Sequence, residues 1–348
     1  METHNLTTMI KRILTTLVSG LIAVAAAAQI TADSTKVQIR AYWEVGDSYT
    51  YNYSEDEYKI QGSDTLEFAT IVELHKYEVL AKTDSTYSMK LTYLDTYSSD
   101  ADVNFMDSLY LAKYGPTEVL FTTDKYGTLQ SVDNIQELTL RQQEFLPAYV
   151  DRIFSTNPEE YADASKEELL TSISPLMSED IVQKTILEHL GLFLCFHGTQ
   201  MEIGRIYSYE EELPSILPTV DVMVDATTYF CADEEYTDEY SAFCIKTTEV
   251  DSDDMVQKLI EYIVSADPEF KSLKKKEQKE TIKKLKDVLS SFHIGKTSTS
   301  SHEVHLGTGW PLSLHLEEIT ISMDSKTGMN LQQCKETYLE IILDDEEG

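Results

Sequence analysis

Basic residues are scarce in this chain of 348 residues, in which 28 lysines and arginines stand against 61 aspartates and glutamates. The formal net charge is −33. Phosphate backbones repel a surface of this sign, which excludes nucleic acid as the main partner. Long apolar runs are also missing beyond the N-terminal region, because the most apolar interior stretch, Ile181 to Phe196, is interrupted by charged residues. We therefore expect no transmembrane segment in the mature chain, since crossing a bilayer takes about 20 consecutive apolar residues.

Signatures of catalysis are lacking as well. No nucleophile elbow, P-loop, dinucleotide fingerprint or EF-hand pattern occurs, and the acidic residues are too numerous to single out a catalytic pair. His302 and His305 lie three residues apart in a predicted strand, so their side chains point to opposite faces and cannot share a metal. The sequence predicts no metal site, no cofactor and no enzymatic activity. A secreted hydrolase with an unrecognised carboxylate-based site is the alternative.

Cysteine is rare, with four residues in the chain. Cys231 and Cys244 flank a short acidic segment between two strand-like runs, which favours a disulfide between them in an oxidising compartment. Four cysteines allow three full pairings, and sequence does not choose among them. Four buried free thiols are the other interpretation, because Cys packs as a small apolar residue.

The N-terminal region combines a basic patch with an apolar run. Lys11 and Arg12 precede the stretch Ile13 to Ala27, and small alanines lead up to Gln29. This order is typical of a signal peptide, which we expect to cover residues 1–28 with cleavage near Ala28. The predicted location of the mature chain is periplasmic or secreted.

Two strand-rich regions follow, and each is joined to a stretch of helical periodicity. Alternation along Trp43 to Tyr53 is the pattern of a half-buried strand, whereas apolar residues in 134–196 and 251–292 recur at helical spacing. The predicted fold is α+β, with two tandem curved antiparallel β-sheet units and amphipathic helices packed against or inserted into them. The first unit covers residues 29–200 and the second 201–348, with a helical insert at 251–292.

An internal repeat supports this division. Val45–Tyr51 and Ile203–Tyr209 share the order β-branched residue, Gly, two variable positions, Tyr, hydroxyl, Tyr. Further along, Asp124 with Gly127 resembles Asp324 with Gly328, and both pairs end an alternating strand. Because the matches occur in the same order, we expect two copies that superpose once the insert is omitted.

Two sets of residues are candidates for binding. The first is a row of tyrosines on one strand face, which either packs in the core or stacks on sugars or an acyl chain in an uncovered concavity; its members are Tyr49, Tyr51, Tyr53, Tyr207 and Tyr209. The second is a basic surface on an amphipathic helix, comprising Lys274, Lys275, Lys276, Lys279 and Lys283. It is either a solvated face drawn to the acidic body or a contact surface for anionic lipid or polysaccharide.

The segments Val45–Tyr51 and Ile203–Tyr209 carry a family resemblance. With the Tyr- and Thr-rich strands that follow them, they resemble a family of uncharacterised secreted β-rich proteins of Bacteroides-like bacteria, whose curved sheet is similar to lipoprotein carriers. This resemblance implies an exported envelope protein and supplies no catalytic residues. The predicted function is a non-enzymatic binding or structural module of the bacterial envelope, with a hydrophobic or glycan ligand or an envelope protein as partner. A protein–protein interaction scaffold is a further alternative.

Overall fold

The structure is a computed structural model. It describes residues 35–156, 159, 161, 165–214, 223–250, 252–266, 270, 273–289, 292–324, 326 and 328–343. The predicted signal peptide, residues 1–28, lies outside these described residues.

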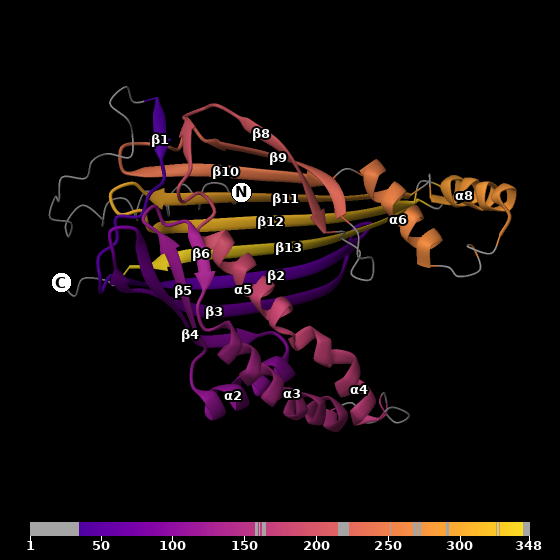
Figure 1. The fold of residues 1–348 in the computed structure, drawn as a ribbon, viewed down its shortest axis with the longest axis horizontal. Coiled ribbons are helices and arrows are strands. Elements are labelled where there is room, and N and C mark those ends of the chain that lie inside the picture. Colours follow the sequence, from indigo (N-terminus) through magenta and orange to yellow (C-terminus); the bar gives the residue numbers. More distant parts are fainter. Residues whose placement is uncertain are drawn as a thin grey trace.

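One antiparallel sheet of 11 strands forms the centre of the described molecule (Figure 1). Its strands are β2 (Ser48–Gln61), β3 (Asp64–Lys82), β4 (Thr86–Ser98), β5 (Glu118–Asp124), β6 (Leu129–Val132), β8 (Tyr207–Pro214), β9 (Met223–Ala232), β10 (Ser241–Val250), β11 (Phe292–His305), β12 (Pro311–Asp324) and β13 (Met329–Ile342). The order across the sheet is β6-β5-β4-β3-β2-β13-β12-β11-β10-β9-β8. A small second sheet pairs β1 (Lys36–Gln38) with β7 (Gln200–Glu202).

The predicted α+β class is confirmed, but the prediction of two separate sheet units is not. The strands of the first half and those of the second half join in one sheet because β2 pairs with β13 along its length, from Thr50 opposite Ile342 to Gln61 opposite Leu331. Two separate sheets would leave two strands of 14 residues with unpaired backbone groups along one edge. Unpaired edges of that length are unfavourable, and pairing them with each other satisfies both.

The helices lie between strands in two groups. The first group is α2 (Ala101–Tyr114), α3 (Ile135–Thr156), α4 (Lys166–Ile173), the short 3-10 helix η1 (Ser174–Met177) and α5 (Glu179–Phe193). The second is α6 (Ser252–Ala266) and α8 (Lys275–Leu289), which fall between β10 and β11 in the stretch where sequence periodicity predicts helix. In Figure 1 the first group lies by the strands of the first half, whereas α6 and α8 lie beyond the far ends of β10 and β11.

The covering elements bury one face of the large sheet, which we call the packed face. Tyr51, Tyr77 and Leu91 on adjacent strands form a core cluster with Leu190 and Phe193 of α5. At the other side of the same face, a second cluster combines side chains of β10 and β11 with those of β1 and β7. Near the far strand ends, α6 contacts β9 and β11.

Side chains that alternate with these form the opposite face, which we call the open face. Over its central strands this face carries Asp56, Tyr58, Glu317, Glu336 and Tyr338. Among the described residues, neither core cluster includes a side chain from these positions, and no helix packs closely on β2, β12 or β13 from this side. The sheet is therefore covered on one face and accessible on the other.

The two segments of the internal repeat agree in the backbone conformation of their glycines but differ in the burial of their tyrosines. Gly46 and Gly204 both adopt positive φ, at 96° and 76°, and each precedes the first strand that its half contributes to the large sheet. Tyr51 is fully buried, whereas Tyr209 is 43% exposed. The matched tyrosines thus occupy different surroundings, because β2 lies in the middle of the sheet and β8 at its edge.

Candidate functional site on the open face of the sheet

The tyrosines of β2 that the sequence nominates for ligand binding form packing contacts beneath α5. Tyr51 meets Phe193 edge-to-face with ring centroids 5.3 Å apart. Tyr49 makes a similar contact with Trp310 at 5.1 Å. A ligand would have to displace α5 to reach these rings, so their position fits the packing interpretation. On β8, Tyr207 stacks on Phe230.

A polar cluster lies in the same interior. The ring of His75 is fully buried, with Nε2 2.6 Å from Oε2 of Glu73 and Nδ1 without a hydrogen-bond partner. On α5, His189 Nε2 lies 3.1 Å from the Tyr77 hydroxyl. Burial, aided by the nearby His75, lowers the pKa of His189 to about 3, so this ring is neutral at physiological pH. The cluster joins α5 to the sheet.

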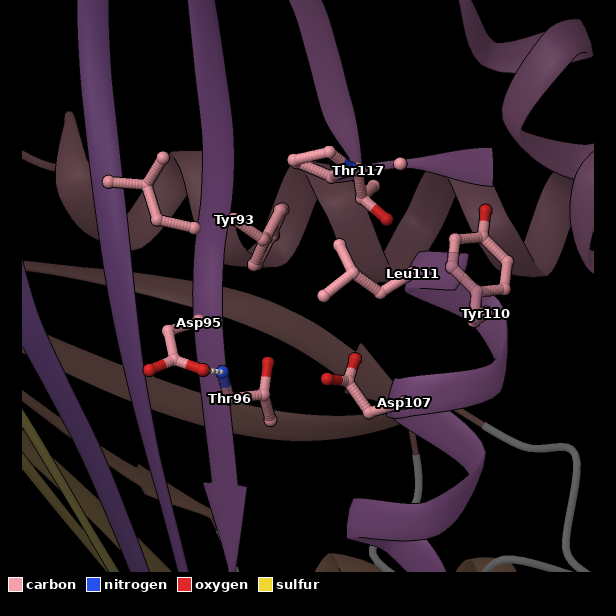
Figure 2. Close-up of a pocket in the computed structure, with 10 residues that line it drawn as sticks. Tyr93, Asp95, Thr96, Asp107, Tyr110, Leu111 and Thr117 are labelled. Carbon is pink, nitrogen blue, oxygen red and sulfur yellow. Dashed lines mark hydrogen bonds between the residues drawn. The ribbon is translucent and has the colours of Figure 1, made fainter. Parts of the chain in front are cut away.

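A small pocket opens between β4 and α2 (Figure 2). It encloses about 20 Å³, which is room for one water molecule. Burial and the charges of Glu73 and Asp95 raise the pKa of Asp107 at this pocket. Figure 2 shows Asp107 on the side of Thr96, with Asp95 beyond the strand. The two carboxylates do not face each other across a substrate-sized space, so the pocket lacks the geometry of a paired acid and base.

The centre of the open face carries a row of carboxylates on neighbouring strands. Asp56 of β2 lies directly opposite Glu336 of β13, which in turn lies opposite Glu317 of β12. Directly opposed residues have Cβ atoms about 5 Å apart, and like charges at that separation destabilise a sheet. Solubility needs no such alignment, because acidic residues placed elsewhere on the surface serve it equally well. A row with this energetic cost is a candidate site.

Hydroxyl groups partly offset this repulsion. Tyr58 donates a hydrogen bond of 2.6 Å to Oε1 of Glu336, and Tyr338 donates to Oε2. Thr70 donates to Asp56 at 2.6 Å. The bonds from Tyr338 and Tyr58 lower the pKa of Glu336, so its carboxylate is held in the charged form. Burial, together with the bond to Glu336, raises the pKa of Tyr338 to about 12.

The row differs in its charge pairing from the carboxylates on the packed face. On the packed face, Glu55 pairs with Lys335 at 2.8 Å and Glu318 with Lys296 at 2.6 Å. Among the described residues, no lysine or arginine forms an ion pair with the three carboxylates of the open face. Their remaining oxygen lone pairs are therefore free to accept hydrogen bonds from an incoming ligand.

Aromatic rings border the carboxylates. The rings of His315 and Tyr338 stack with centroids 4.4 Å apart and planes 6° from parallel. Tyr338 is 38% exposed, and Nε2 of His315 is buried without a hydrogen-bond partner. Exposed rings and accepting carboxylates thus lie side by side on adjacent strands. We call Asp56, Tyr58, His315, Glu317, Glu336 and Tyr338 the acidic–aromatic patch.

The predicted disulfide between Cys231 and Cys244 is wrong. Cys231 of β9 lies opposite Ile245, while Cys244 of β10 lies opposite Ala232. Directly opposed residues share a face and neighbours along a strand do not, so the two sulfur atoms project from opposite faces. All four cysteines are free thiols, but only Cys244 and Cys334 are buried, so the alternative of four buried free thiols holds in part.

The predicted basic surface lies on or just before α8. Lys274, Lys275, Lys276, Lys279 and Lys283 are all exposed. They belong to or adjoin a helix that lies beyond the ends of β10 and β11 (Figure 1), whereas the acidic–aromatic patch lies on β2, β12 and β13. The two surfaces are therefore separate features of the molecule.

The described part of the chain has neither a cluster of metal ligands nor a helix that could span a membrane. No group of three or more His, Cys, Asp or Glu side chains is arranged to hold a metal ion. No helix has both the length and the apolar character that crossing a bilayer demands.

The sequence shows the residues of the acidic–aromatic patch, but it does not show that they lie close together in the fold. Glu336 and Tyr338 alternate along one strand, as do Ser54, Asp56 and Tyr58 along another, which places each set on one face. Their meeting depends on the pairing of β2 with β13, two strands about 280 residues apart. The sequence pattern that could have indicated the patch is the alternation of acidic residues and tyrosines in these two segments.

Comparison with known proteins gives weak likenesses. No protein-family model and no curated protein matches the sequence. Among solved structures, one of lipovitellin, described for its lipid–protein interactions, has a TM-score of 0.41 and 12% identity over 86% of this chain. This chain spans only 25% of the lipovitellin chain. A Rh. blastica porin variant has a TM-score of 0.24 and 6% identity, covering 85% of this chain and 100% of the porin.

An outer membrane channel from Pseudomonas putida F1 has a TM-score of 0.17 and 8% identity, covering 87% of this chain and 98% of the channel. TM-scores this low assign neither a fold family nor a function.

Proposed function

We propose that this chain is an exported, non-enzymatic binding module of the bacterial envelope, and that its acidic–aromatic patch binds a neutral glycan. The observation that carries the proposal is the row of Asp56, Glu336 and Glu317, which forms no ion pair with a described lysine or arginine and is bordered by tyrosines on an accessible sheet face.

The chemistry of the patch suits a sugar. Aromatic rings offer an apolar surface to the C–H faces of a pyranose, and carboxylates accept strong hydrogen bonds from its hydroxyl groups. Neutral glycans carry many such donors and no charge to be repelled. Anionic ligands are disfavoured, because three carboxylates at this spacing repel phosphate and sulfate groups.

A glycan is favoured over an acyl chain because the tyrosines of β2 pack against core residues. The tyrosines that would line an acyl cavity contact Trp310 and Phe193 instead. The pocket between β4 and α2 holds about one water molecule, far below the several hundred Å³ of a typical ligand pocket. Binding on a surface needs no such cavity.

Glycan-array screening of the purified chain, followed by isothermal titration calorimetry with the best-retained oligosaccharide, tests the proposal. Tyr338→Ala should weaken binding about tenfold or more, since an aromatic anchor commonly contributes over 1 kcal/mol to binding. Asp56→Asn should weaken it less, because the amide oxygen still accepts a hydrogen bond.

The matched control is Tyr149→Ala on α3, since Tyr149 is also an exposed tyrosine, at 44%. Loss of binding in this control but not in Tyr338→Ala would move the site away from the patch. A chain that retains no glycan and instead captures envelope proteins would favour the scaffold alternative. Turnover of a retained oligosaccharide would overturn the non-enzymatic part of the proposal.

A further inference from the structure

The helix α8 projects from the body of the protein. Its substantial packing contacts are with α6 alone, and Figure 1 shows it as the outermost element beyond the ends of β10 and β11. Its half-buried residues, Gln278, Thr281, Ile282, Leu285 and Leu289, recur at helical spacing and so define the side directed at α6. The rest of the helix circumference faces away from the protein.

The lysines of α8 gather along that outward circumference. Five of the six lysines of α8 fall within an arc of about 100° at 3.6 residues per turn, and only Lys284 lies outside it; the five are Lys275, Lys276, Lys279, Lys283 and Lys286. All five are exposed. The helix's acidic residues, at positions 277, 280 and 287, fall outside this arc. The result is a straight row of ammonium groups, which we call the lysine stripe.

Among the described residues, the lysines of the stripe form no ion pair with a carboxylate, whereas seven lysines elsewhere do. Lysines elsewhere form ion pairs: Lys76, Lys82, Lys90, Lys166, Lys184, Lys296 and Lys335. Within the described chain, no lysine of the stripe lies within ion-pairing distance of a carboxylate. This is unexpected in a chain of net charge −33, where acidic partners are abundant. The stripe is thus held away from the acidic body rather than neutralised by it.

We propose that the lysine stripe of α8 docks on an anionic membrane surface through lipid phosphate headgroups. A linear row of point charges on a projecting helix matches a flat layer of headgroups, and each juxtamembrane lysine adds to such attraction. Repulsion between the membrane and the acidic body would orient the protein with α8 toward the lipid and the body away from it.

Exposed apolar residues favour a lipid surface over an anionic polysaccharide. Leu273 just before the helix is 36% exposed and Ile263 on α6 is 38% exposed, whereas Val288, 55% exposed, lies on the side of α8 away from the stripe. Lipid offers hydrocarbon beneath its phosphates, where such side chains gain by burial. An anionic polysaccharide offers negative charge but no hydrocarbon in which these apolar side chains could be buried.

Vesicle co-sedimentation of the full chain tests the proposal. We expect binding to vesicles of phosphatidylglycerol mixed with phosphatidylcholine, no binding to pure phosphatidylcholine, and loss of binding as sodium chloride is raised. Lys279→Glu with Lys283→Glu should reduce the binding at least about tenfold. The control pair Lys113→Glu with Lys125→Glu changes the net charge by the same amount at exposed positions elsewhere and should bind as the unaltered chain does.

Several outcomes would overturn the proposal. One is that the unaltered chain does not bind the mixed vesicles. Another is that the two double variants lose vesicle binding equally, which would mean that binding depends on net charge and not on the lysine stripe. Equal binding to pure phosphatidylcholine would exclude headgroup recognition. Binding to dextran sulfate at concentrations where vesicles are not bound would assign the stripe to an anionic polymer. Circular dichroism of both double variants verifies that the helices remain folded.

Discussion

The hydroxyl of Tyr58 donates a hydrogen bond of 2.6 Å to Oε1 of Glu336, two residues that lie 278 positions apart in the sequence. The bond links β2 in the first half to β13, the last strand of the second half, across the junction where the two strands pair. It also fixes one oxygen of the central carboxylate of the acidic–aromatic patch. A single hydrogen bond thus joins the two halves of the sheet and also orients a carboxylate of the proposed site.

Tyr58→Phe should destabilise the protein by about 1 kcal/mol at neutral pH, because it removes a hydrogen bond to a charged group on a partly exposed surface. Hydrogen bonds lower the pKa of Glu336 in the folded state, so their stabilising effect is present above the pKa of the unfolded carboxyl and is lost as pH falls through the folded value. Urea unfolding at pH 7 and at pH 3 measures this. The difference between variant and parent should shrink at the lower pH, while the control Tyr149→Phe should show none at either.

Buried neutral histidines should make the fold sensitive to mild acid. Burial lowers the pKa of His302 to about 3 and of His197 to about 4. An unfolded histidine gains a proton near pH 6.5, so stability falls as pH drops below that value and continues to fall until the folded pKa is reached. Each such ring should cost up to about 2 kcal/mol between pH 7 and pH 5.

The variant His302→Leu tests this through the slope of unfolding free energy against pH. The slope between pH 7 and pH 5 should become shallower, because one fewer group takes up a proton on unfolding. Nε2 of His302 has no hydrogen-bond partner to lose. An unchanged slope would mean that His302 does not titrate differently in the two states.

Gly309 should be intolerant of a side chain. Its φ is +76°, and a Cβ added there would lie 2.0 Å from the backbone oxygen of Arg40. Gly309→Ala should therefore destabilise the protein by about 3 kcal/mol or more, combining backbone strain with displacement of the N-terminal segment. The matched control is Gly191→Ala, at a helical position with no neighbouring atom within 4 Å. It should be neutral or stabilising by up to about 1 kcal/mol, and thermal unfolding of both variants distinguishes the two cases.

The cysteines should react as thiols at rates set by burial. Burial raises the pKa of Cys244, which is fully enclosed, whereas Cys231 is only partly covered. Iodoacetamide labelling under native conditions should modify Cys231 and leave Cys244 unmodified until the protein is unfolded. Peptide mapping without reduction should recover no peptide linking the two. Recovery of that linked peptide would contradict the opposite-face geometry of β9 and β10.

The sequence by itself determined the local features of this protein. Period-two alternation located strands such as β2 and β12, helical spacing marked α5, α6 and α8, and the Asp–Gly pairs at 124–127 and 324–328 marked the turns of two hairpins. Each of these depends on residues within a few positions of one another, where backbone preference and amphipathic pattern act. The α+β class and the exposed lysines of α8 followed from the same kind of information.

Only the tertiary structure decided which strands meet and which faces are covered. Two halves with similar strand patterns can form two sheets or one, and the pairing of β2 with β13 is a contact between distant segments that no local pattern specifies. That pairing buried Tyr51 beneath α5 and aligned Asp56 with Glu336. The register of β9 against β10 likewise placed Cys231 and Cys244 on opposite faces. Because a shift of one residue reverses every side chain in a strand, the composition of each face becomes known only when the register is known.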